Sequence, residues 1–219
     1  ALALATIVCR GSIESGAGQN QAESLHDRIR AWVTRCGLDT EFEPRESEML
    51  RAPLGTLEAN QVNVATWEVE GLAILVWALG LSGLPPHDER VDPFEVTDRV
   101  WFLHDEAAEM MLDVELRAAT ELRAYRELVY AIHCRLDDFS RTQTKKDFRA
   151  WTESGWFETL GLAPESLIVD NDLAIGGTDI SRVEPALIET CTWLTLPRHR
   201  ASIWLLGDGA PYSKTYVST

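Results

Sequence analysis

The sequence is short of positive charge. Its 219 residues contain 20 Lys and Arg against 35 Asp and Glu, which gives a formal net charge of −15 at pH 7 and a pI near 4.7. A surface this acidic repels nucleic-acid phosphates and anionic lipid headgroups, so we expect neither a nucleic-acid partner nor a membrane. A basic protein or a small molecule is the better electrostatic match, although solubility alone also explains the acidity.

Paired cysteines and long apolar runs are also missing. The four cysteines lie far apart without a CxxC, which argues against a zinc knuckle, a thioredoxin-type site or a disulfide framework. The apolar N-terminal run of residues 1–9 has no basic flank and is too short for a signal peptide or a membrane span. We therefore predict reduced thiols in a cytoplasmic protein.

The local motifs of common enzyme classes are absent as well. HExxH, GxSxG and Walker-type loops do not occur, and the Gly16-Ala17-Gly18 stretch lacks the preceding strand of a dinucleotide loop. His104, Asp105 and Glu106 are metal-ligand types, but adjacent helical residues diverge and do not face one ion. We therefore expect no metal and no cofactor.

Helical periodicity dominates the rest of the chain. The strongest signal is residues 61–81, where Val62, Val69 and Val76 recur at seven-residue steps and every residue from Leu72 to Leu79 is apolar. A helix that is apolar on all sides lies in the middle of a bundle. The other predicted helices are 2–10 (ended by Gly11), 22–36, 44–50, 93–104, 105–117, 120–139, 145–160, 184–193 and, after a break near Pro197, 198–206.

The period changes after residue 160. Residues 167–169 are β-like, and two short apolar-containing runs flank Gly176-Gly177, a pair that tolerates the positive φ angles of a tight turn. We therefore predict a mainly α protein: a single helical domain over residues 1–219, with a small β-hairpin at about 167–181 in its C-terminal third.

Four segments occur in an order that is typical of one family. They are Trp67-Glu68-Val69-Glu70-Gly71 with Trp77-Ala78-Leu79-Gly80 and Leu84-Pro85, then Glu127 to His133, then Asp172 to Gly177, then Arg198-His199-Arg200-Ala201 with Trp204-Leu205. Together they resemble the uncharacterised bacterial DUF4272 domain family over nearly the whole chain. The chain departs from the family pattern at Ala131, Cys134, Pro197 and Ile203. The resemblance implies no known activity.

Glu70 is the first candidate for a functional residue. It lies in the most apolar predicted helix, on one strip with Ile74 and Trp77. A buried carboxylate needs a partner, or its pKa rises. Glu70 is therefore either a tuned general acid or base, a metal ligand, or half of a buried ion pair with Arg198, and we favour the ion pair.

The other candidates lie in the C-terminal half. The predicted helix 120–139 has an apolar seam, formed by Leu122, Tyr125, Val129, Ile132 and Leu136. Tyr130 and His133 share a strip that borders this seam, where His133 either transfers protons or forms a plain hydrogen bond. Arg198 and His199 begin the predicted last helix, whose free N–H groups suit an anion. Trp77 and Trp204, two of eight tryptophans, either fill the core or line a pocket.

Three functions remain open at this level. The leading hypothesis is a non-catalytic cytoplasmic protein that binds a basic partner or a small ligand. The second is an enzyme, hydrolase-like, in which Glu70 and His133 act as acid and base in a pocket between helices. The third is a neutralising partner of a basic toxin.

Overall fold

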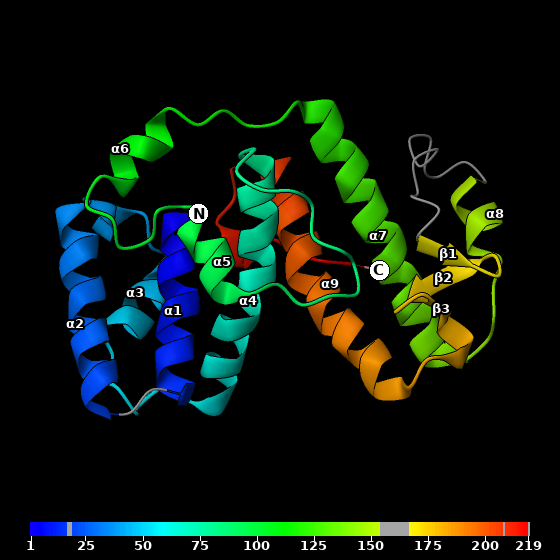
Figure 1. Ribbon diagram of the computed structural model, residues 1–219, viewed down its shortest axis with the longest axis horizontal. Helices are drawn as coiled ribbons and strands as arrows, with labels where there is room; N and C mark the ends of the chain where they lie inside the picture. The colour runs from blue at the N-terminus through cyan, green and yellow to red at the C-terminus, as the bar shows by residue number, and fades with distance from the viewer. Residues whose placement is uncertain (17–18, 154–166, 208, 219) are drawn as a thin grey trace. The chain divides into compact units, whose positions relative to one another are not determined.

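The computed structural model describes residues 1–16, 19–153, 167–207 and 209–218. These residues are mainly helical, with a small antiparallel sheet in the C-terminal part, as predicted (Figure 1). The chain divides into two compact units. The N-terminal unit comprises residues 1–84 and 91–116, and the C-terminal unit comprises residues 85–90 and 117–219. The single domain stays a prediction.

The N-terminal unit is helical throughout its regular structure. Its elements are α1 (Leu2–Gly16), α2 (Gln19–Arg35), the short 3-10 helix η1 (Leu38–Thr40), α3 (Pro44–Arg51), α4 (Ala59–Ala78), α5 (Pro93–Asp98) and α6 (Ala107–Leu112). Helix α1 packs against both α2 and α4 (Figure 1). No helix among the described residues of either unit is long and apolar enough to cross a membrane.

Helix α4 is the predicted buried helix. Every residue from Glu68 to Ala78 is buried, Trp77 among them. The helix ends at Ala78 and is followed by Gly80 in the left-handed region, with φ of 71°, where a residue without Cβ avoids strain. The prediction that an all-apolar helix lies in the interior is confirmed.

The predicted helix end at Gly11 is wrong, because α1 continues to Gly16. A Cβ atom at Gly11 would lie 2.8 Å from the Cβ of Ala65 on α4. The missing side chain therefore lets the backbones of α1 and α4 approach closely, and this contact outweighs the helix-breaking tendency of glycine.

A buried arginine fixes the loop between α3 and α4 onto α1. Arg10 is fully buried, and it donates to Glu14 at 2.5 Å and to the carbonyl oxygens of Met49, Ala52 and Pro53 at 3.2–3.3 Å. Glu14 in turn accepts from the Leu57 N–H at 3.0 Å. The buried guanidinium thus has both a counter-charge and backbone acceptors, which offset its desolvation.

The C-terminal unit combines two long helices with a small sheet. Its elements are α7 (Ala119–Thr142), α8 (Phe148–Glu153), β1 (Ile168–Val169), β2 (Asp172–Ile175), β3 (Thr178–Asp179), η3 (Ile180–Arg182), α9 (Pro185–Leu205) and η4 (Tyr212–Lys214). Helices α7 and α9 pack together, and the seam of α7 that the sequence predicts is buried. The end of the predicted helix 145–160 lies outside the described residues.

The sheet has three antiparallel strands, and its first strand, β1, lies in the stretch 167–169 that the sequence predicts to be β-like. The predicted hairpin is β2–β3, with Gly176 and Gly177 in its turn at φ of 58° and 72°. A second tight turn, formed by Asp170 and Asn171 at φ of 52° and 69°, joins β1 to β2. Asp and Asn tolerate this left-handed geometry better than other residues with a side chain.

The predicted helix break near Pro197 is also wrong. Helix α9 runs without interruption through Pro197, which is buried, as are Leu194, Thr195 and Arg198 around it. Proline removes one backbone hydrogen bond from the helix interior. The packing of these buried neighbours holds the helix together across that loss.

Charged side chains connect the parts of the C-terminal unit. Arg135 on α7 donates twice to Asp172 on β2, both at 2.7 Å, and once to the Thr144 carbonyl at 2.9 Å. Asp172 also accepts from the Lys146 N–H at 2.9 Å. Both partners of this ion pair are buried, so its geometry fixes α7 against the sheet.

Residues 85–90 belong to the C-terminal unit because of three polar side chains. The His87 ring nitrogen Nε2 lies 2.6 Å from the Ala174 carbonyl of β2, so Nε2 carries the proton. Asp88 accepts from the Gly176 N–H at 2.7 Å. Arg198 on α9 donates to two carbonyl groups of the same segment, as described below.

Candidate functional site

Three of the predicted residues meet between α7 and α9. The Nδ1 atoms of His133 and His199 lie 3.0 Å apart, and the two rings are nearly perpendicular at 88°. Tyr130, one turn before His133, places its ring 5.6 Å from that of His199. Both histidines are buried and Tyr130 is half-buried. The strip predicted on α7 is thus completed by a histidine from α9.

Burial keeps the histidine pair neutral. Burial first, and then the neighbouring His133 and Arg126, lower the pKa of His199 to about 4. Burial also lowers the pKa of His133, an effect that Asp137 partly opposes. In the neutral pair, one Nδ1–H donates to the lone pair of the other Nδ1. A proton on both Nδ1 atoms would set two donors face to face.

Two further polar side chains beside the pair, Tyr130 and Cys134, favour their neutral forms. The hydrogen bond with the Cys134 thiol raises the pKa of Tyr130. Burial raises the pKa of Cys134, so its thiolate, the nucleophilic form, is disfavoured. The cluster can therefore hold and relay a proton, but it offers no activated nucleophile.

Glu70 is buried in α4 and has a partner in its own unit. Its carboxylate accepts from the Val91 N–H at 3.1 Å, which joins α4 to the segment before α5. Arg198 and His133 belong to the C-terminal unit. The ion pair with Arg198 and the shared pocket with His133 therefore stay predictions.

Arg198 does not begin a helix, because α9 starts at Pro185; the predicted anion site at a helix N-terminus is wrong. Arg198 instead donates to the carbonyl oxygens of Pro86 at 2.5 Å and Glu89 at 2.7 Å. It is a buried cation within α9 that holds residues 85–90.

The two candidate tryptophans differ in environment. Trp77 is a buried residue of α4. Trp204 is 37% exposed, donates from Nε1 to the Ala210 carbonyl at 3.0 Å, and packs its ring 5.9 Å from that of Tyr212. Trp204 thus fixes the C-terminal tail. Among the residues that the structure describes, no three His, Cys, Asp or Glu side chains gather in a metal-ligand cluster.

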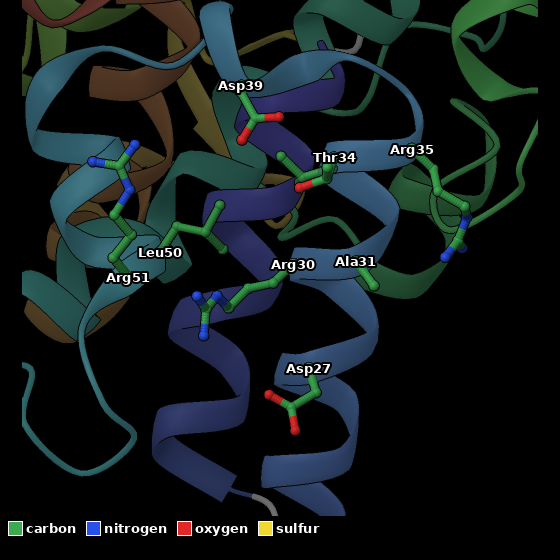
Figure 2. A pocket seen from close by; sticks show the side chains of 9 residues that line it. Asp27, Arg30, Ala31, Thr34, Arg35, Asp39, Leu50 and Arg51 are labelled. Carbon is green, nitrogen blue, oxygen red and sulfur yellow. The ribbon is translucent and has the colours of Figure 1, made fainter.

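A pocket of about 560 Å³ lies in the N-terminal unit, between α2, η1 and α3 (Figure 2). It is lined by Asp27, Arg30, Ala31, Val33, Thr34, Arg35, Asp39, Leu50 and Arg51. This pocket was not predicted from the sequence. The signal was present, since Asp27, Arg30, Ala31 and Thr34 recur at the three- and four-residue steps that align side chains along one helix face.

Fold and site together define a mainly helical protein with a buried histidine pair and an open, charged pocket. The chain belongs to the family DUF4272, described as a domain of unknown function, whose model matches residues 1–147. The segments at 67–85 and 127–133 fall inside this match, and those at 172–177 and 198–205 lie beyond it. No curated protein and no solved structure matches the chain.

Proposed function

We propose that the protein is a non-catalytic binding protein whose N-terminal unit docks a basic partner. The observation that carries this proposal is an uneven distribution of charge. The N-terminal unit contains 19 acidic and 7 basic residues, a net charge of −12, whereas the C-terminal unit contains 16 and 13, a net charge of −3. Solubility needs no such asymmetry, while electrostatic steering of a partner to one unit does.

Residues 105–116 are the strongest candidate for the contact surface. This segment has five acidic residues and no basic residue. Leu112 is 84% exposed, Leu116 56% and Met110 39%. Large apolar side chains grouped at the surface among charges are typical of an interaction site. A basic amphipathic helix fits this chemistry, and a basic toxin is one partner that could supply it.

A titration with designed peptides tests the proposal. The probe is a basic amphipathic helix of Leu and Lys, and the control peptide has the same composition in scrambled order. We expect the amphipathic peptide to bind more tightly, and its affinity to fall when salt rises from 50 to 200 mM. Leu112→Ser should weaken binding, while Val64→Ser, an exposed apolar site on α4, should not.

Two results would count against this proposal. Equal binding of both peptides would mean attraction by net charge alone, without a docking surface. Equal loss in the two variants would place the surface away from residues 105–116.

We further infer a cytoplasmic location. All four cysteines, Cys9, Cys36, Cys134 and Cys191, are free thiols. Proteins of oxidising compartments commonly pair their cysteines, and those of the cytoplasm keep them reduced. When the protein is isolated without a reductant, unfolded in urea and then treated with a thiol reagent, four cysteines per chain should be labelled. Fewer labelled cysteines would contradict this inference.

Acid–base catalysis is the second candidate, and the histidine pair favours it. A screen with small ester and amide substrates would support an enzyme if turnover were lost in His133→Asn. Turnover that survives this substitution would exclude His133 as the base.

A further inference from the structure

The charged pocket of the N-terminal unit is lined by several arginine side chains, although the unit as a whole is strongly acidic. Of the seven basic residues of this unit, Arg30, Arg35 and Arg51 line a single pocket, which lies between α2, η1 and α3. The unit offers 19 acidic residues as ion-pair partners for them. Such a grouping of arginines needs an explanation other than average composition.

Two of these arginines have no partner within the described part of the chain. Arg35 pairs with Asp105 at 2.8 Å, and Figure 2 shows its side chain directed to the opposite side of α2 from that of Arg30. Arg30 and Arg51 make no hydrogen bond or ion pair with any described residue. Their guanidinium donors are therefore free to bind a ligand.

The rest of the pocket adds acceptors and an apolar wall. Asp27 and Asp39 line it without forming an ion pair to Arg30 or Arg51 (Figure 2). Val33 and Leu50, both buried, supply apolar lining. The volume of about 560 Å³ suits a small molecule.

We propose that this pocket binds a small molecule that carries a carboxylate or phosphate group and at least one O–H or N–H donor. The guanidinium groups of Arg30 and Arg51 bind the oxyanion, for which their planar donor geometry is well suited. The carboxylates of Asp27 and Asp39 accept hydrogen bonds from the donor. An anion without donors would leave these carboxylates without hydrogen-bond partners, and their negative charge would repel it.

This small-molecule site goes beyond the docking of a basic partner, because it recognises an oxyanion rather than a basic group and uses different residues. The pocket lies on α2, η1 and α3, whereas the proposed docking segment is residues 105–116. The failure of one proposal therefore leaves the other intact.

Calorimetric titration at low salt tests the ligand class with three probes. Glycerol 3-phosphate offers a phosphate with hydroxyl donors, L-serine a carboxylate with donors, and acetate a carboxylate without donors. We expect a Kd below about 1 mM for glycerol 3-phosphate or L-serine, and at least tenfold weaker binding of acetate. No saturable binding of the first two probes, or equal binding of acetate and L-serine, would overturn the proposal.

Variants then locate the site. Arg30→Gln and Arg51→Gln should each weaken binding of the preferred probe about tenfold. The matched control is Arg28→Gln, an exposed residue of the same helix that does not line the pocket. An equal loss in Arg28→Gln would mean non-specific attraction, and unchanged binding in Arg30→Gln and Arg51→Gln would place the ligand elsewhere. In Asp27→Asn, the ratio of the acetate Kd to the L-serine Kd should be smaller than in the wild type.

Discussion

Mild acid should destabilise the C-terminal unit through His199. Burial lowers the pKa of His199 from 6.5 to about 4, so the folded state requires a neutral ring. The unfolded chain exposes the ring and binds a proton as the pH falls through 6.5. The contribution of this group to stability is therefore complete above pH 6.5 and is lost progressively as the pH falls towards 4.

The two pKa values set the magnitude of this loss. At pH 5 the ring is almost fully protonated in the unfolded state and almost fully neutral in the folded state. The free energy of unfolding should therefore fall by about 2 kcal/mol between pH 7 and pH 5 from His199 alone. Carboxylates titrate mostly below this window, with ordinary pKa values near 4, so the histidine effect can be separated from theirs.

Urea denaturation at pH 7 and pH 5 measures the loss, with α7 and α9 followed by amide hydrogen exchange. His199→Asn keeps a hydrogen-bonding group near His133 and removes the titration. Its pH-dependent loss should be smaller than that of the wild type by about 2 kcal/mol. His104→Asn, an exposed histidine of the N-terminal unit, is the control and should retain the wild-type loss. Equal losses in His199→Asn and the wild type would refute the reasoning.

Three other predictions follow from packing and burial. Gly11→Val should destabilise the protein by about 1–3 kcal/mol in urea denaturation, since its side chain overlaps α4, whereas Gly16→Ala has free space and should be neutral or slightly stabilising. Asp172→Ala should cost about 3 kcal/mol, visible as a lower thermal midpoint, because it removes the buried counter-charge of Arg135 and leaves this arginine only its pair with the partly exposed Asp138. Burial raises the pKa of Cys191 to about 11, so this thiol should react with a thiol reagent at pH 8 far more slowly in the native protein than in urea.

Periodicity predicted the long helices because it reports directly on burial. The seams of residues 61–81 and 120–139 correspond to α4 and α7, and the Gly176-Gly177 turn corresponds to β2–β3. The errors occurred where a tertiary contact outweighed the local helix-breaking tendency of a residue. Gly11 was expected to end a helix, but its missing side chain serves the contact with α4. Pro197 was expected to break a helix, but its buried neighbours maintain it.

The candidate site was predictable only in part, for a related reason. Tyr130 and His133 share a helical strip, and spacing within one helix is visible in sequence. The partner of His133 is 66 residues away on another helix, and sequence spacing alone does not show which faces of two helices meet. The same limit hid the pair of Arg135 and Asp172, which lie 37 residues apart.

Peptide binding by the N-terminal unit and the stability of the C-terminal unit should change over different ranges of pH. Between pH 6.5 and 5 the contribution of His199 to the stability of the C-terminal unit is lost, because the unfolded chain takes up the proton while the folded ring stays neutral. Carboxylates with ordinary pKa values near 4 remain mostly charged in this range. Peptide binding by the N-terminal unit should therefore persist at pH 5.5, even as hydrogen exchange in α7 and α9 becomes faster. If both changed together at this pH, the docking surface would depend on the C-terminal unit, and the assignment of partner binding to the charge of residues 105–116 would be wrong.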